Sequence, residues 1–196
     1  MLILEIVLGI ILLFAYLYFR YTKRTHESLT LKIEKYLEAN DEMKKTLAMG
    51  LYLRFKVENE EAPAKYSSIF MKEDPISFEY FAAEIFQASR GGSVWVSPAS
   101  NDQGVDFEHN TENGLYLGQV KCHQGDLSYE PIALIHSNMV KRGAVGGYVI
   151  TTGSFTENAR KYAEGLDIEL IDGVRLVEEW LDGLRGNKKK IERQIS

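Results

Sequence analysis

Three polar residues of unlike chemistry stand in a stretch, Gly104 to His123, whose pattern otherwise predicts a hairpin of two strands. They are Asp106, Gln119 and Lys121. Because side chains alternate along a strand, Gln119 and Lys121 point to one face, and Asp106 joins them if it pairs opposite. A carboxylate and an ammonium in a dry core must pair or bind something. Two interpretations stay open: an Asp106–Lys121 ion pair with Gln119 hydrogen-bonded nearby, or a functional site.

The elements that must position these residues follow from the hydrophobic pattern. A helix starts at Asp74-Pro75, where an N-cap precedes proline, and Gly91-Gly92 ends it. We expect strands at 93–97, 105–108, 115–121, 147–151 and 168–171, turns at 98–104 and 111–114, and helices at 128–142, 156–164 and 174–184. This order predicts an α/β domain with a mixed sheet and helices on its faces.

Composition limits the remaining classes of protein. The chain has 196 residues, 45% of them hydrophobic, which suffices for one ordinary domain with additions. A net charge of −5 argues against a basic nucleic-acid binder as a whole but allows a local basic patch. The single cysteine, Cys122, excludes an internal disulfide and a cysteine-based zinc site.

The N-terminal segment differs from the rest. Leu2 to Phe19 is apolar except for Glu5, and a helix of this length spans about 27 Å, enough for a bilayer core. Basic residues follow at 20–24, which predicts that the remainder stays in the cytoplasm. We therefore expect residues 1–24 to be a single-pass anchor in the cell inner membrane. A signal peptide would need basic residues before the run and a small-residue cleavage site after it.

Two further segments flank the predicted domain. Residues 25–71 have apolar residues near helical spacing and predict a neck of one or two amphipathic helices. These helices pack either on the membrane surface or on the globular domain, with a break at Glu58–Pro63. Residues 186–196 form a charged tail that we expect to fray.

The order of the sequence blocks carries a family resemblance. The blocks are PISFEYFAAEIF, NDQGVDF, GQVKCH and GGYVITTGSFTENARKYAEGLDIELIDGVRL. Together they resemble the Mrr-like restriction endonuclease branch of the PD-(D/E)XK nucleases, over roughly Asp74 to Leu184. The resemblance implies a nuclease domain at 72–185 with a restriction-endonuclease-like mixed sheet. Gln119 replaces the acid of the wider superfamily, as is normal in Mrr-like proteins, so a second metal ion is not expected.

The resemblance also implies a chemistry. The matching catalytic residues are Glu79, Asp106, Gln119 and Lys121. Mg²⁺ would take oxygen ligands from Asp106, Gln119 and the backbone carbonyl of Val120. Lys121 would stabilise the charge that grows on phosphorus. The implied reaction is hydrolysis of a DNA phosphodiester bond, with DNA and the membrane as partners and a homodimer as an allowed assembly.

Several basic residues are candidate contacts to the DNA backbone. They are His123, Lys141, Arg142, Arg160 and Lys161. Exposed helix charges and a polar strand end explain them equally well. The loop Thr151–Ser154 lies before a helix capped by Thr156, where helix capping is the default interpretation and contact with DNA phosphate is the alternative.

Two rival functions remain at this stage. In the first, the domain is a nuclease fold that binds DNA near the membrane without cutting it. In the second, the chain is a membrane scaffold whose neck mediates assembly. Cleavage requires the metal ion and Lys121, whereas phosphate binding alone tolerates the loss of both.

Overall fold

The computed structural model describes residues 2–56, 75–98 and 104–195, and describes only the backbone of residues 2–8, 26–34, 37–38, 75 and 187–195. The chain divides into two units, Met1–Asp41 and Glu42–Ser196. The predicted break at residues 58–63, the N-cap at residue 74 and the turn residues 99–103 lie outside the described residues.

The first unit is one helix, α1 (Leu2–Ala39). It runs without interruption through the basic residues at 20–24, which therefore do not end it. Within the part of the chain that the structure describes, no helix combines the length and apolar character needed to cross a membrane. The anchor predicted at 1–24 includes side chains that lie outside that part, and it stays a prediction.

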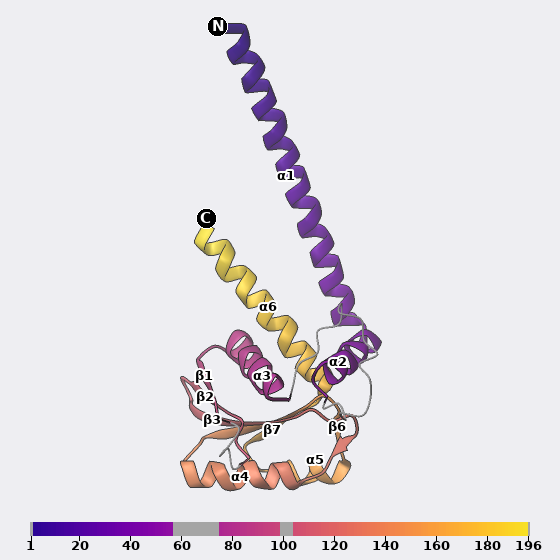
Figure 1. The fold of residues 1–196 in the computed structure, drawn as a ribbon, viewed down its shortest axis with the longest axis vertical. Coiled ribbons are helices and arrows are strands. Elements are labelled where there is room, and N and C mark those ends of the chain that lie inside the picture. The colour runs from indigo at the N-terminus through magenta and orange to yellow at the C-terminus, as the bar shows by residue number, and fades with distance from the viewer. Residues whose placement is uncertain (1, 57–74, 99–103, 196) are drawn as a thin grey trace. The chain divides into compact units, whose positions relative to one another are not determined.

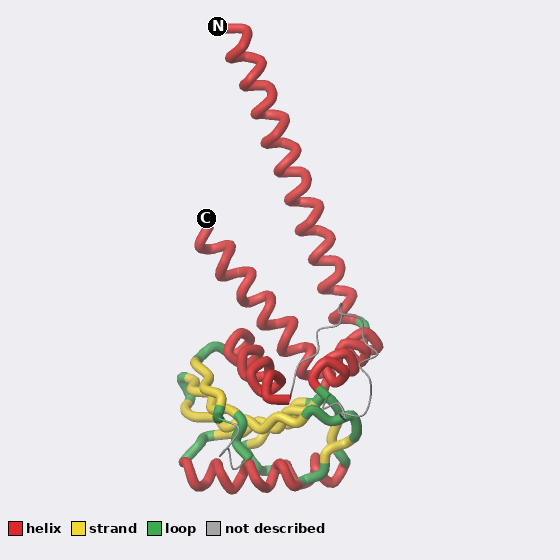
Figure 2. Tube along the Cα trace, viewed as in Figure 1, coloured by secondary structure: helices red, strands yellow, loops and turns green. Residues whose placement is uncertain are grey.

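The second unit contains a mixed sheet between helices, as Figures 1 and 2 show. Its helices are α2 (Asp41–Phe55), α3 (Pro75–Arg90), α4 (Glu130–Arg142), α5 (Glu157–Ala163) and α6 (Gly173–Ile195). Its strands are β1 (Ser93–Val96), β2 (Phe107–Thr111), β3 (Gly114–Lys121), β4 (Asp126–Leu127), β5 (Gly146–Thr151), β6 (Ser154–Phe155) and β7 (Ile168–Ile171).

The main sheet has the order β1-β2-β3-β5-β7. The pairs β1–β2 and β2–β3 are antiparallel, whereas β5 is parallel to both β3 and β7. The strands β3, β5 and β7 therefore end at one edge, at Lys121, Thr151 and Ile171, which we call the carboxyl edge. The antiparallel strand β2 begins at the same edge, so the residues before it meet the end of β3.

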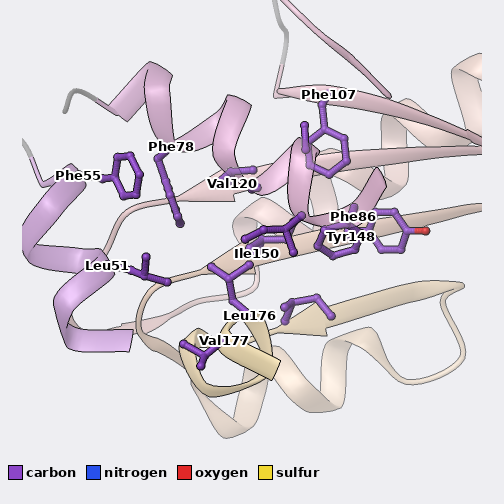
Figure 3. Close-up of a cluster of buried hydrophobic side chains, with 14 of the residues drawn as sticks. Leu51, Phe55, Phe78, Phe86, Phe107, Val120, Tyr148, Ile150, Leu176 and Val177 are labelled. Carbon is purple, nitrogen blue, oxygen red and sulfur yellow. The ribbon is translucent and has the colours of Figure 1, made fainter. Parts of the chain in front are cut away.

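Each face of the sheet has its own core. Phe78, Phe86 and Leu176 of α3 and α6 pack with Val120 and Ile150 on one face (Figure 3). Ile132 and Ile135 of α4 and Ala159 of α5 pack with Leu117 and Val149 on the other. Consecutive residues of β3 alternate between these cores, which fixes the face to which each candidate side chain points.

The helix α2 completes the first core. Ala48, Leu51 and Phe55 are buried in the cluster that contains Val120, and Phe55 has no exposed surface. Lys44 also forms an ion pair with Glu178 of α6, with 2.6 Å between nitrogen and oxygen. The sequence left open whether the neck packs on the membrane or on the domain, and residues 42–55 pack on the domain.

Most predicted elements are present with shifted ends. The helix at Pro75, the turn between β2 and β3, and the Thr156 cap, whose side chain accepts a hydrogen bond from Ala159, are confirmed. The strand expected at 105–108 begins instead at Phe107, and the last helix continues to Ile195 beyond the expected end at residue 184. The short pair β4–β6 was not predicted, because two-residue strands carry no periodicity.

Replacing Phe55 with alanine should destabilise the second unit by about 3–5 kcal/mol, since it removes a fully buried ring and leaves a cavity. Leu53→Ala, on the exposed side of the same helix, should have a small effect. Urea unfolding followed by the fluorescence of Trp180, which packs against Phe81, measures both. Equal midpoints for Phe55→Ala and the wild type would contradict a structural role for α2.

Candidate functional site

Asp106 is fixed at the carboxyl edge by backbone hydrogen bonds on both sides. Its N–H donates to Gly118 O of β3 at 2.8 Å, and its carbonyl oxygen accepts from Ser97 N at 2.8 Å. The carboxylate is almost fully buried, and its Oδ2 accepts from Val120 N at 2.6 Å. The β2–β3 ladder ends at the Phe107–Gly118 pair, and because Asp106 N also bonds Gly118 O, Asp106 bulges out of the regular register. Its carboxylate lies against the backbone of Val120, between Gln119 and Lys121.

Gln119 lies on the face of the sheet covered by α4. A Cβ atom on Gly104 would stand 3.4 Å from the Gln119 amide nitrogen and would overlap Leu134 of α4, so only glycine fits there. Gly104 also has a φ of +83°, which favours glycine. The backbone at Gly104 therefore packs beside the Gln119 side chain.

Lys121 follows on the same face and is exposed. Its ammonium is therefore not a buried charge that needs an internal partner. The structure thus brings a buried carboxylate, a buried amide and an exposed ammonium to one end of β3. This arrangement favours a site open to solvent over an ion pair enclosed in the core.

The oxygen atoms of this cluster suit a hard divalent cation. The Gln119 carbonyl Oε1 is buried and accepts no hydrogen bond from the described residues. An unsatisfied buried polar atom costs about 1–3 kcal/mol, so a ligand that bonded this oxygen would recover that free energy. Within the described residues, no group of three or more His, Cys, Asp or Glu side chains gathers around one point. A cation here would rely on Asp106 together with amide and peptide oxygens.

Two further predicted residues lie close to this end of the sheet. Glu79 is half-buried near the start of α3, where its neighbour Phe78 packs in the same cluster as Val120. The helix α3 covers the face of the sheet opposite to Gln119. His123 is exposed two residues beyond Lys121, at the carboxyl edge.

The predicted basic contacts do not form one patch. Arg142 pairs with Glu108 of β2 at 2.7 Å. Lys141 and Arg142 end α4 just before β5 begins, at the end of the sheet opposite to the carboxyl edge. Arg160 lies at the carboxyl edge, where it donates to Ser154 at 3.1 Å. Lys161 pairs with Glu157 along its own helix at 2.7 Å.

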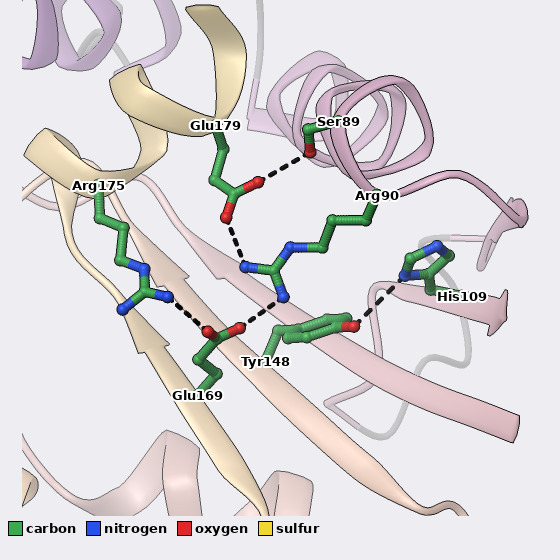
Figure 4. A network of polar contacts seen from close by, with 7 residues as sticks. All are labelled: Ser89, Arg90, His109, Tyr148, Glu169, Arg175 and Glu179. Atoms are coloured by element: carbon green, nitrogen blue, oxygen red, sulfur yellow. Dashed lines mark hydrogen bonds and ion pairs between the residues drawn. The ribbon is translucent and has the colours of Figure 1, made fainter. Parts of the chain in front are cut away.

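A second polar cluster, not singled out from the sequence, joins the end of α3 to α6 and β7 (Figure 4). Arg90 contacts Glu179 at 2.5 Å and Glu169 at 2.6 Å, and Arg175 shares Glu169 at 2.6 Å. A cavity of about 570 Å³ lies beside it, lined in part by Tyr148. No sequence pattern pointed to this cluster, because its residues come from distant segments of the chain.

This cluster is internally neutralised. Burial lowers the pKa of Arg90, but hydrogen bonds to Glu179 and Glu169 outweigh it and raise that pKa above its ordinary value. Burial raises the pKa of Glu179, but hydrogen bonds from Arg90 and Ser89 outweigh it and lower that pKa overall. Burial raises the pKa of Tyr148 to about 12. These groups keep fixed charges near neutral pH, which is typical of a structural network.

Comparison with known families gives one match. The family described as "Restriction endonuclease" (Mrr_cat) matches residues 70–180, which include Asp106, Gln119 and Lys121. Comparison with curated proteins finds no match.

Two solved structures are similar to this chain. The MspJI restriction endonuclease, in complex with a 27-mer oligonucleotide, is 26% identical with a TM-score of 0.46 over 58% of this chain. The DNA modification-dependent restriction endonuclease AspBHI is 16% identical with a TM-score of 0.48 over 74% of this chain. The matched parts make up 29% and 40% of those two chains, so this chain corresponds to less than half of either.

The Glu179 charge should make stability depend on acidity. Because its pKa in the folded chain lies below the unfolded value, the carboxylate stabilises the fold above about pH 4.5, and this contribution disappears as pH falls through the folded pKa. The difference in unfolding free energy between the wild type and Glu179→Gln should therefore be constant near neutral pH and shrink in acid. Urea titrations from pH 3.5 to 7 measure it.

Glu84→Gln, an exposed change on α3, is the matched control for that series and should follow the wild type at every pH. If Glu179→Gln also followed the wild type throughout, Arg90 would not be stabilising the Glu179 carboxylate.

Proposed function

Because the chain belongs to the Mrr_cat restriction endonuclease family, we propose that it hydrolyses phosphodiester bonds in DNA. The observation that carries the proposal is the convergence of Asp106, Gln119 and Lys121 at one end of β3, within the residues that match the family. The site is open to solvent at Lys121, as a DNA strand requires.

The proposed cofactor is Mg²⁺. The buried Gln119 carbonyl oxygen and the Asp106 carboxylate support this choice, because Mg²⁺ prefers oxygen ligands and keeps several waters. The backbone carbonyl of Val120 is the third proposed protein ligand. When bound, the ion would polarise a phosphoryl oxygen and acidify water.

The residues of the chain have separate roles in this proposal. The Val120 N–H holds the Asp106 carboxylate in position, so it need not be ordered when substrate binds. Lys121 stabilises the negative charge that grows on the phosphoryl group. Glu79 acts from the opposite side of the sheet on a proton or a water molecule at the same end.

DNA would approach the carboxyl edge with little general electrostatic help. Acidic residues outnumber basic ones in residues 70–180. Among the described residues, basic residues at the carboxyl edge include Lys121, His123 and Arg160, the last of which pairs with Asp172 at 3.6 Å. Lys141 and Arg142 lie at the other end. We therefore propose weak, salt-sensitive binding that depends on Mg²⁺ to offset phosphate repulsion.

The location of the protein is proposed from the sequence. The apolar run at 2–19 and the basic residues after it support a single-pass anchor at 1–24 in the cell inner membrane, with the nuclease domain in the cytoplasm. A homodimer is compatible with this proposal and would supply two sites for the two strands of DNA.

Substituting Lys121 with alanine should slow cleavage strongly. Full-length chain in non-ionic detergent should nick supercoiled plasmid in Mg²⁺ and not in EDTA, and Lys121→Ala should be slower by about 10²-fold or more. Lys141→Ala, an exposed lysine at the other end of the sheet, should cut at the wild-type rate. If the folded wild type bound plain and methylated DNA but cut neither, the proposed nuclease function would be wrong and the domain would be a DNA-binding module.

Metal binding offers a test that does not need cleavage. Asp106→Asn keeps the shape of the side chain but removes the charge, so Mn²⁺ affinity should fall by at least about tenfold. Electron paramagnetic resonance of free Mn²⁺ measures this affinity. Asp182→Asn, an exposed carboxylate on α6, should bind Mn²⁺ as the wild type does. Equal affinities in all three proteins would contradict the assignment of Asp106 as a ligand.

A further inference from the structure

The segment that leaves β3 is tied to the loop that leaves β5. Thr152 is buried, and its Oγ1 accepts from His123 N at 3.0 Å and donates to His123 O at 2.9 Å. Its own N–H donates to Lys121 O at 3.4 Å. One side chain thus satisfies both backbone groups of His123, two residues beyond the lysine of the candidate site.

The loop around Thr152 is closely packed against neighbouring backbone. A Cβ atom on Gly153 would lie 2.3 Å from Gly125 O and 2.8 Å from His123 O, so the two backbones are in direct contact. On the other side, a Cβ atom on Gly173 would lie 2.3 Å from Thr152 O. Gly173 N also donates to Gly153 O at 2.9 Å, which ties the loop to the start of α6.

This contact matters because the regular sheet ends at that point. Lys121 and Thr151 form the last pair of the β3–β5 ladder. Beyond this pair, the position of the backbone depends on the hydrogen bonds of His123. The Thr152 hydroxyl makes two of them. The Lys121 backbone belongs to that last pair, and its carbonyl oxygen accepts from Thr152 N. The Thr152 hydroxyl adds the two hydrogen bonds that hold the residue two positions after it.

We propose that Thr152 is a positioning residue that fixes the end of β3 and thereby holds Lys121 at the candidate nuclease site. This inference rests on the proposed function. Thr152 acts through the backbone of residues 121–123 and does not contact substrate. Its hydroxyl is the essential group, because only a group that both donates and accepts can satisfy the His123 N–H and C=O together.

Two substitutions separate the hydroxyl from the shape of the side chain. Thr152→Ser keeps the hydroxyl, and Thr152→Val keeps the branched shape while removing both hydrogen bonds. Thr152→Val should lower kcat for plasmid nicking by about tenfold to 10²-fold, with KM for DNA and Mn²⁺ affinity changed by less than about twofold. Thr152→Ser should restore at least half of the wild-type kcat.

A merely structural role would give another pattern. It would lower kcat, DNA affinity and Mn²⁺ affinity together, in proportion to the fall in the urea midpoint. That pattern, or a wild-type kcat in Thr152→Val, would overturn the proposal. Thr46→Val, an exposed change on α2, is the matched control and should leave every parameter unchanged.

Cys122 provides a readout that does not depend on cleavage. It is the only cysteine, it lies between Lys121 and His123, and its half-buried Sγ contacts Tyr52 O at 3.7 Å. Loosening of the segment should expose it to a thiol reagent. Comparison at the high-pH plateau of the rate profile removes differences in thiol pKa between variants.

The plateau rate of Cys122 alkylation should rise about tenfold in Thr152→Val and stay near the wild-type value in Thr152→Ser. If the wild type does not cut DNA, the proposed function fails while this rate still shows whether Thr152 fixes the strand end. An unchanged rate in Thr152→Val would overturn the inference even in an active nuclease.

Discussion

The hydrogen bond from Val120 N to the Asp106 carboxylate is the interaction on which this site depends. It crosses from the residue before β2 to the end of β3, where the regular ladder no longer connects the two strands. A buried carboxylate is tolerated only when it is hydrogen-bonded, and a backbone N–H is the most rigid donor a sheet can offer. Since Ser97 also bonds Asp106 from the side of β1, three strands converge on one residue. Because Asp106 bonds both Gly118 and Val120, the backbone of Gln119 between them is held as well.

The two faces of the sheet explain why the domain needs helices from both ends of the chain. Val120 points into the core under α3 and α6, while Gln119 points toward α4, so consecutive residues of β3 serve packing and chemistry in turn. The ring of Phe55 fills the first core near Phe78 and Phe81, with centroid distances of 5.0 and 5.4 Å. A fragment beginning at residue 72 would lose this ring and expose the layer that supports Val120. The helix α2 therefore belongs to the frame of the site although it lies outside the family match.

Sequence patterns predicted the local elements well and the long-range contacts poorly. The strand β5 is buried at every position, as its unbroken apolar run indicated. Periodicity could not say what the amphipathic α2 would cover, because an apolar stripe fits a membrane surface and a sheet equally well. The spacing of Asp106, Gln119 and Lys121 predicted a cluster, and the hydrogen bond from Val120 N brings the Asp106 carboxylate to the backbone between Gln119 and Lys121. The role of Thr152 left no trace in the sequence, since its partner is the backbone of a residue 29 positions away. For Arg142, charge alone did not show that its ion-pair partner would be Glu108, which lies in a different element.

Two polar clusters of opposite character occupy different parts of this sheet, and the contrast assigns their roles. Around Arg90, the opposite charges of Glu169, Glu179 and Arg175 satisfy one another at short range, so a ligand would have to break strong pairs to bind there. At the carboxyl edge, a buried amide oxygen of Gln119 accepts no hydrogen bond from the described residues. An oxygen in that state can serve as a ligand without breaking a hydrogen bond among those residues. The cost is tolerable here because the Asp106 hydrogen bond and the Thr152 contacts hold the surrounding backbone rigid. The paired charges around Arg90 thus suit a structural role, whereas the buried oxygens at the carboxyl edge suit the ligand site proposed above.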